Sequence, residues 1–226
     1  MDNNYRSEWK HSITYSDMLT LRHRLHAAMK PDAHAGADGS YLVRSLYFDT
    51  PEDNALREKI DGVSNREKFR IRSYNADPSF IQLEKKHKRN GYGNKQHASL
   101  RYEETQRILE GDLRWMPTSG RALVIELYSK MKAQRLQPKT IVEYTREAFV
   151  CAAGNVRVTL DYDIRTGLSG TDFLNPNCMT IPAGEPVYLL EVKWDAFLPS
   201  AIRNAVQLQG RRSTAFSKYQ SCRIYG

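Results

Sequence analysis

The sequence predicts an α+β fold in which about eight antiparallel strands close, or nearly close, into a barrel with flanking helices. The first observation is that charged or polar residues alternate with apolar residues at strand period in five segments. The second is that most of the expected strands follow one another as hairpins. Five strands with a charged face are too many for an ordinary apolar core, so a polar barrel interior is expected. The charged or polar residues of the alternating sets are Arg6, Glu8 and Lys10; Lys68, Arg70 and Arg72; Gln82, Glu84, Lys86 and Lys88; Arg157, Thr159, Asp161, Asp163 and Arg165; and Glu191 and Lys193.

The first half of the chain is expected to contain five strands and two helices. Met18, Leu21, Leu25 and Met29 have helical spacing after Ser16–Asp17, and this helix ends before Pro31. A second, short helical segment spans residues 51–59, and glycine and proline make residues 31–40 a loop. The expected strands cover residues 5–13, 41–49, 66–74, 80–89 and 95–102.

The second half is expected to contain three helices and three strands. The longest helix runs over residues 119–135, with a shorter one before it at 103–111 and another near the C-terminus at 199–208. A turn at Ala152–Asn155 joins two antiparallel strands, and the glycine and proline content of residues 167–186 indicates a surface loop. The expected strands cover residues 139–150, 155–165 and 187–194.

Composition indicates a single globular domain over residues 1–226. Hydrophobic residues make up 40% and charged residues 27%, as in ordinary soluble proteins. The net charge of +8 favours an anionic partner, which could be nucleic acid, a membrane surface or a phosphorylated molecule. Cys151, Cys178 and Cys222 show no zinc-type spacing and suggest buried thiols in a reducing compartment. Without a signal peptide or membrane-length apolar run, a cytoplasmic protein is expected, and a membrane-bound partner is left open.

The cations on the alternating strands are candidate phosphate ligands. Arginine binds phosphate oxygens in bidentate fashion, and lysine supplies a compact positive charge. The alternative is that these residues only face solvent. The candidates are Lys10, Arg70, Arg72, Lys86, Arg146 and Arg157, with Arg6, Lys88 and Lys193 as additions.

Carboxylates on the same strands offer a metal site. Mg²⁺ and Mn²⁺ take oxygen ligands, and Mg²⁺ typically uses one or two protein carboxylates together with substrate phosphates. Glu191 is the favoured metal ligand, whereas salt bridging to nearby cations is an equal alternative for Glu8, Glu84, Glu143 and Asp161. Other chemistries lack support. Ser217 has no nucleophile-elbow motif, the histidines form no metal motif, and there is no P-loop.

Several motifs together resemble a known family. Arg6-Ser-Glu8-Trp-Lys10 is similar to the ExExK motif of triphosphate tunnel metalloenzymes. The chain more closely resembles the catalytic tunnel domain of vacuolar transporter chaperone (VTC) polyphosphate polymerases, in particular the stand-alone bacterial form. The other resembling segments are residues 45–50, 66–72, 83–86, 155–161, 189–193 and 216–219.

The resemblance implies a tunnel of about eight antiparallel strands that binds a triphosphate and a divalent metal. Glu191 would hold Mn²⁺ or Mg²⁺, with Glu8 as a helper. The γ-phosphate of ATP would pass to the end of a growing polyphosphate chain. The residues implied to act on phosphate are Lys10, Arg70, Arg72, Lys86, Arg146, Arg157 and Lys218, with Lys88 and Lys193 as further phosphate-binding residues.

Two departures from the family pattern matter. Arg6 occupies the first acidic position of ExExK, a change that VTC-type domains share. The chain also lacks the inositol-phosphate-sensing and membrane parts of the eukaryotic complexes, which leaves regulation and product export open. Three hypotheses remain: a polyphosphate polymerase, a triphosphatase on the same tunnel, and a non-catalytic polyanion-binding module. A nucleic-acid partner is not expected, because no RNA-binding motif occurs.

Overall fold

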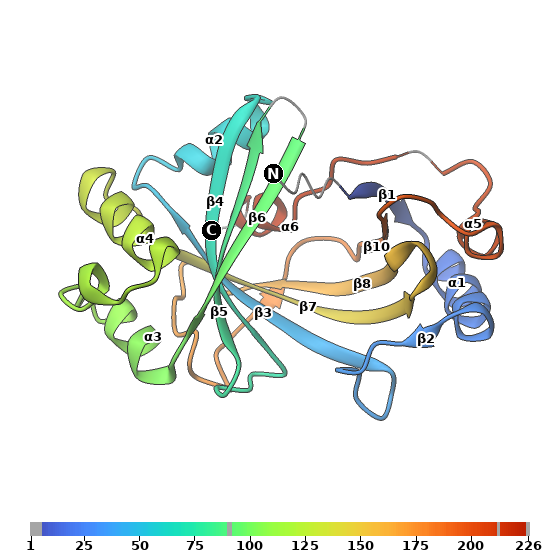
Figure 1. Cartoon of the computed structure of the whole chain (residues 1–226), viewed down its shortest axis with the longest axis horizontal. Helices are drawn as coiled ribbons and strands as arrows, with labels where there is room; N and C mark the ends of the chain where they lie inside the picture. The colour runs from blue at the N-terminus through green and yellow to red at the C-terminus, as the bar shows by residue number, and fades with distance from the viewer. Residues whose placement is uncertain (1–5, 90–91, 212, 225–226) are drawn as a thin grey trace. The chain divides into compact units, whose positions relative to one another are not determined.

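The computed structural model describes residues 6–89, 92–211 and 213–224. No helix in these ranges has the length and apolar character needed to cross a membrane. The elements in chain order (Figure 1) are β1 (Ser7–Ile13), α1 (Tyr15–Ala28), β2 (Lys30–Pro31), β3 (Ser40–Asp49), α2 (Asn54–Ile60), β4 (Asn65–Tyr74), β5 (Ile81–Arg89), β6 (Tyr92–Leu100), α3 (Tyr102–Leu109), η1 (Met116–Thr118), α4 (Ala122–Ala133), β7 (Gln137–Cys151), η2 (Ala153–Asn155), β8 (Val156–Thr166), β9 (Ile181–Pro182), β10 (Tyr188–Trp194), α5 (Ser200–Val206) and α6 (Lys218–Arg223).

The strands pair in one hydrogen-bonded order, β1-β10-β8-β7-β3-β4-β5-β6. The short strands β2 and β9 pair with β7 and β8. The register is antiparallel between β1 and β10, β10 and β8, β3 and β4, β4 and β5, and β5 and β6. The α+β class with an antiparallel sheet and flanking helices, expected from the alternating segments, is confirmed.

The chain divides into two compact units. The first unit comprises residues 1–42, 144–164 and 185–217, and the second comprises residues 43–143, 165–184 and 218–226. Strands β3, β7 and β8 each contribute residues to both units.

In the first unit, α1 packs its apolar residues against the strands. Met18, Leu21 and Leu25 are buried at helical spacing, and they join Val158 and Val192 of β8 and β10 in one core. A capping box fixes the start of the helix: the Thr14 hydroxyl accepts from the Asp17 N–H, and Asp17 accepts from the Thr14 N–H. The apolar residues of β8 and β10 are thus buried, and their charged residues occupy the other face.

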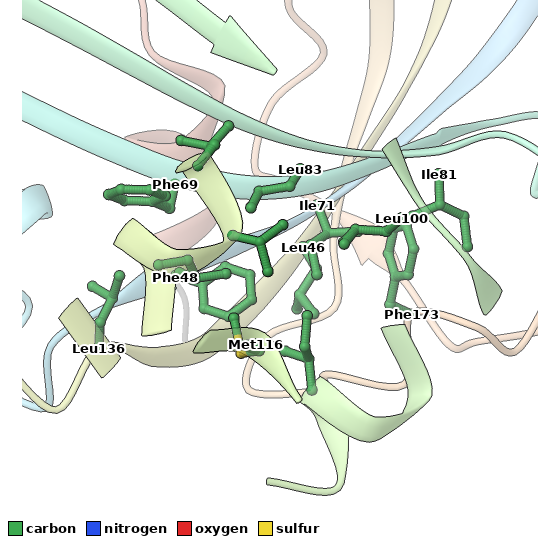
Figure 2. Packing of buried hydrophobic residues seen from close by; sticks show 14 of the residues in the cluster. Leu46, Phe48, Phe69, Ile71, Ile81, Leu83, Leu100, Met116, Leu136 and Phe173 are labelled. Atoms are coloured by element: carbon green, nitrogen blue, oxygen red, sulfur yellow. The ribbon is translucent and has the colours of Figure 1, made fainter. Parts of the chain in front are cut away.

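In the second unit, α3 and α4 cover the apolar face of β4–β6. Figure 1 shows both helices on one side of these strands, and Figure 2 shows Phe69, Ile71 and Leu83 packed within the core beneath them. Apolar residues alternate with charged ones on β4 and β5. Since neighbouring strand residues point to opposite faces, this alternation gives each strand an apolar face and a charged face. The face of β4–β6 that bears Arg70 and Glu84 therefore lies away from this core.

Several element boundaries differ from the expectations. Tyr102 belongs to α3 rather than to the preceding strand, because the Glu104 carboxylate accepts from the Arg101 N–H and so begins the helix there. The C-terminal segment contains a helix, α6, that the sequence did not predict. The short strand β2 ends at the start of the expected 31–40 loop, and β9 lies within the expected 167–186 loop.

The alternation on β8 also ends earlier than expected. Asp163 has a left-handed backbone with φ of 46° and an exposed side chain, and Ile164 after it is buried. This irregularity interrupts the strand period, as β-bulges do. The prediction that Asp163 and Arg165 continue the face of Arg157 and Asp161 is therefore wrong. Arg165 instead donates to the hydroxyl and the carbonyl of Thr180 in the second unit.

Candidate functional site

The first charged cluster lies in the first unit, on β1, β7, β8 and β10. The register places Lys10 opposite Glu191, and Glu191 opposite Thr159. Directly paired residues share one face of a sheet, so these three side chains lie together on the face away from Val158 and Val192. The members of this first cluster are Glu8, Lys10, Arg146, Asp161, Glu191 and Lys193.

Glu191 is the centre of this cluster. Its carboxylate lies 2.8 Å from the Lys193 ammonium, 3.7 Å from that of Lys10 and 3.9 Å from the Arg146 guanidinium. Burial acts to raise the pKa of Glu191, but Lys193, Lys10 and Arg146 outweigh it and hold the pKa well below its usual value. Glu191 is therefore a buried, ionised carboxylate at neutral pH.

Lys10 and Arg146 are held by several carboxylates. Burial acts to lower the pKa of Lys10, but Glu191, Glu8 and Asp161 together raise it above its usual value. Arg146 donates two hydrogen bonds to Asp161, at 2.6 and 2.8 Å, which fixes the guanidinium plane. The cations of this cluster are thus matched by carboxylates.

Arg157 lies in the same unit with different partners. Its guanidinium is 2.6 Å from the Asp32 carboxylate and donates to the Tyr41 hydroxyl at 2.9 Å. Neither partner was predicted. Tyr41 could have been found, because it alternates along β3 with Ser45, Tyr47 and Asp49, which also make polar contacts.

The donor set for a divalent metal is small. Among the residues that the structure describes, no three His, Cys, Asp or Glu side chains gather as a metal-binding group. Glu191 remains a suitable ligand, because Mg²⁺ in phosphate-handling sites needs only one or two carboxylates besides the phosphates. Glu8 is exposed and approaches Lys10 at 3.6 Å, so it is available as a second oxygen ligand.

The second charged cluster lies in the second unit, on β3–β6. Glu84 is buried and accepts from Arg70 at 2.7 Å, with Lys95 at 2.6 Å and Arg72 at 3.8 Å. On β3, the Tyr47 hydroxyl accepts from Arg70 at 2.8 Å and the Ser45 hydroxyl accepts from Arg72 at 3.1 Å. Arg70 and Arg72 are therefore held by partners on both neighbouring strands, β3 and β5.

The pKa values in this cluster report an excess of positive charge. Burial acts to raise the pKa of Tyr47, yet Arg70, Arg72 and Lys68 lower it below its usual value. The pKa of Glu84 is also lowered: burial acts to raise it, but Arg70, Arg72 and Lys95 dominate. Burial lowers the pKa of Lys68 to about 8; Tyr47 and Asp49 oppose this effect, and Lys59 and Arg66 add to it. Unlike the first cluster, this face has more cations than carboxylates to neutralise them.

Helix α6 brings Lys218 to the second unit. Tyr219 anchors this helix, because its hydroxyl donates to Asp49 at 2.6 Å and its ring stacks on Tyr47 at 4.8 Å. Burial, followed by the charge of Asp49, raises the pKa of Tyr219, so its hydroxyl stays protonated and able to donate. Lys218 is half-buried at the first position of this helix.

The predicted site residues thus fall into two clusters, each in its own unit. Lys10, Arg146, Glu191, Lys193 and Glu8 come together in the first unit, with Arg157 on separate partners. In the second unit, Arg70 and Arg72 meet at Glu84. Lys86 and Lys88 continue the polar face of β5 beside Glu84, with Lys86 exposed and Lys88 half-buried.

Two further carboxylates act as salt-bridge partners, the alternative left open in the sequence. Glu143 binds Arg44 at 2.5 Å and accepts from the Thr180 hydroxyl at 2.9 Å. Arg44 in turn donates to the carbonyls of Phe173, Asn175 and Pro176, so this pair secures the 167–186 loop. Asp161 is occupied by Arg146.

Comparison with known proteins gives a family and a fold. The family model of the VTC domain matches residues 5–224, whereas no curated protein matches the chain by sequence. An adenylate cyclase candidate from Bacillus halodurans has a similar structure, with a TM-score of 0.52 and 16% identity over 85% of this chain and 82% of its own. An adenylyl cyclase candidate from Hippeastrum, described as having dominant triphosphatase activity, has a TM-score of 0.55 and 13% identity over 95% and 93%. At these identities the likeness concerns the fold.

Proposed function

Because the chain belongs to the VTC domain family, we propose that it is a polyphosphate polymerase that transfers the γ-phosphate of ATP to a growing polyphosphate chain. The observation that carries this proposal is the unequal charge of the two clusters. The second unit presents more cations than carboxylates on the polar face of β3–β6, which favours a polyanionic ligand. The first unit presents an ionised carboxylate among balanced charges, which favours a metal ion.

The residues of the second unit would bind phosphate oxygens. Phosphoryl transfer depends chiefly on positioning and on neutralising the charge of the transferred group. Arg70 and Arg72 are suited to this role, because Tyr47, Ser45 and Glu84 hold their guanidinium planes before the substrate arrives. Lys86, Lys88 and Lys218 would add positive charge around the bound chain.

The first unit contains the candidate metal site and its own set of phosphate ligands. Glu191, with Glu8 as a helper, would hold Mn²⁺ or Mg²⁺, which polarises phosphate oxygens when bound. Lys10, Arg146, Arg157 and Lys193 would turn from their carboxylate partners to phosphate oxygens. The attacking oxygen at the end of a polyphosphate chain is already ionised, so the polymerase reaction requires no general base from the protein.

A triphosphatase is the second candidate. The Hippeastrum structure shares the fold and is described as having triphosphatase activity, and Glu8 is exposed where it could orient an attacking water. In that case the same cations would bind the triphosphate, and water would replace the terminal phosphate as acceptor.

One experiment separates the candidates. We expect purified protein incubated with ATP and Mn²⁺ to produce acid-labile polymers that are visible on a gel, and chelation of the metal to stop their formation. Release of phosphate without polymer would support the triphosphatase. Salt-sensitive binding of polyphosphate with neither product would indicate a non-catalytic binding module.

A further inference from the structure

One buried hydroxyl group in the first unit has no hydrogen-bond partner. Thr159 lies within β8 and is 3% exposed, and its Oγ1 atom makes no hydrogen bond among the residues that the structure describes. A threonine hydroxyl offers one donor and two acceptor positions, and leaving them unpaired in a protein interior costs free energy. Since most buried polar groups are hydrogen-bonded, the Thr159 hydroxyl points to a ligand from outside the chain.

Strand register places this hydroxyl in the first charged cluster, beside Glu191. Thr159 of β8 is the direct antiparallel partner of Glu191 on β10, and the Cβ atoms of directly paired residues lie about 5 Å apart. Val158 and Leu160 on either side of Thr159 are buried in the apolar core. The Thr159 side chain therefore lies on the opposite face, which it shares with the ionised carboxylate of Glu191.

The charged groups around Thr159 are paired with one another rather than with its hydroxyl. Arg146 donates two hydrogen bonds to Asp161, and the ammonium groups of Lys10 and Lys193 lie 3.7 and 2.8 Å from Glu191. The side chains of these two lysines are 21% and 33% exposed, and both are flexible. Their movement toward substrate phosphates would free the Glu191 oxygens and leave them next to the unpaired hydroxyl.

A hydroxyl and a carboxylate together suit a divalent metal. Mg²⁺ and Mn²⁺ take oxygen ligands. In P-loop NTPases, a class with a different fold, Mg²⁺ is held by a serine or threonine hydroxyl, an aspartate and the substrate phosphates. Thr159 and Glu191 offer the same two types of oxygen from adjacent strands. The hydroxyl also adds an oxygen ligand without adding negative charge, so it does not repel a phosphate substrate.

We propose that Thr159 is a second protein ligand, through its hydroxyl oxygen, of the divalent metal held by Glu191. The inference rests on the proposed function and deepens it, because it adds to the metal site a residue that the search for clustered histidine, cysteine and acidic side chains does not consider. It also accounts for the unpaired hydroxyl, which gains its partner when the metal binds.

The test compares two substitutions in the full chain. Thr159→Val replaces the hydroxyl by a methyl group of similar size, whereas Thr159→Ser keeps the hydroxyl. Calorimetric titration with MnCl₂ measures the affinity for the metal. We expect Thr159→Val to weaken Mn²⁺ binding by about tenfold or more, the usual scale for lost groups at metal sites, and Thr159→Ser to stay within about threefold of the wild type.

Urea unfolding in the presence of a chelator distinguishes a metal ligand from a structural residue. Thr159→Val removes a buried polar group that has no partner, so its unfolding midpoint without metal should equal or exceed that of the wild type. Thr105→Val is the matched contrast, because the buried Thr105 hydroxyl donates to the Arg101 carbonyl in the second unit. This control should lower the unfolding midpoint and leave Mn²⁺ affinity unchanged.

Three results would overturn the assignment of Thr159. They are wild-type Mn²⁺ affinity in Thr159→Val, an equal loss of affinity in Thr159→Ser, and a lower unfolding midpoint of Thr159→Val without metal. Weaker binding of tripolyphosphate by Thr159→Val in metal-free buffer would also overturn it, since the hydroxyl would then contact phosphate. If the wild type still forms polymer from ATP, each of these results leaves the proposed function in place. A wild type that binds no Mn²⁺ would remove both the ligand and the proposed metal-dependent reaction.

Discussion

Individual charged residues differ in what holds them in their ionised form. Glu191 is buried, and it stays ionised because Lys10, Arg146 and Lys193 surround it. Lys68 is half-buried without a comparably close carboxylate, and burial lowers its pKa to about 8. Desolvation thus opposes the charge of both residues: the surrounding cations outweigh it at Glu191, whereas it dominates at Lys68.

Replacing Glu191 separates turnover from binding. We expect Glu191→Gln to reduce ATP turnover by at least about a hundredfold, because the neutral amide is a poor ligand for a hard divalent metal. Polyphosphate binding should remain within about threefold of the wild type, since the neighbouring cations are kept. Steady-state kinetics and calorimetry measure the two effects.

Glu185→Gln is the control for this change, because Glu185 is exposed in the same unit. Unchanged turnover in Glu191→Gln would remove the metal assignment. A parallel loss of turnover and polyphosphate binding would instead make Glu191 a structural residue.

At the scale of elements, a buried side-chain hydrogen bond helps to attach helix α6, beside the Arg223–Asp53 ion pair and the Tyr219–Tyr47 stacking. The Tyr219 hydroxyl donates to Asp49, and Asp49 also accepts from the backbone N–H groups at the start of α2. The Asp49 carboxylate therefore links α2, β3 and α6, and it holds Lys218 in the second unit.

We expect Tyr219→Phe to destabilise the protein by about 1.5–3 kcal/mol, the usual range for a hydrogen bond to a charged group. The loss arises because the buried Asp49 side chain loses a hydrogen-bond donor. Urea unfolding measures this change. Tyr102→Phe is the matched control, since the Tyr102 side chain is exposed at the start of α3. An equal effect of the two substitutions would show that the link through Asp49 contributes nothing.

For the molecule as a whole, the distribution of charge connects stability with ligand binding. The carboxylates of Glu84 and Glu191 both have lowered pKa values, and each neutralises several cations. Their contribution to stability is fully present above a pH of about 4.5, the usual pKa of glutamate. It is lost as the pH falls below that value, because the unfolded chain then binds protons more readily than the folded protein does.

The free energy of unfolding should therefore fall steeply between about pH 4.5 and pH 3.

Glu84→Gln should lower the free energy of unfolding by about 3–5 kcal/mol at pH 7, because Arg70, Arg72 and Lys95 lose their shared partner. The same substitution should make the free energy of unfolding less dependent on acid pH. Tripolyphosphate should stabilise this variant more than the wild type if its phosphates neutralise the same cations. Urea unfolding across this pH range checks both results. An acid dependence unchanged from the wild type would contradict the role given to Glu84.

Most of the helices and strands could be predicted because their patterns depend on residues that are close together in the sequence. The two-residue alternation identified the charged faces of β1, β4, β5 and β10, and helical spacing identified α1 and α4. Local pattern failed at Asp163, where a single left-handed residue shifts the face of β8. It also failed at α6, whose short segment is held by a distant carboxylate rather than by its own helix propensity.

By itself, the sequence determined the fold class, the strands with a charged face and the resemblance to the VTC family. Only the tertiary structure decided which of those charges are neutralised. Strand register made Glu84 the partner of Arg70, and it placed Lys68, Lys86 and Lys95 in one row, although no local pattern relates β6 to β4. The physical reason is that alternation depends on neighbouring residues, whereas charge compensation depends on burial and on contacts between residues that are far apart in the chain.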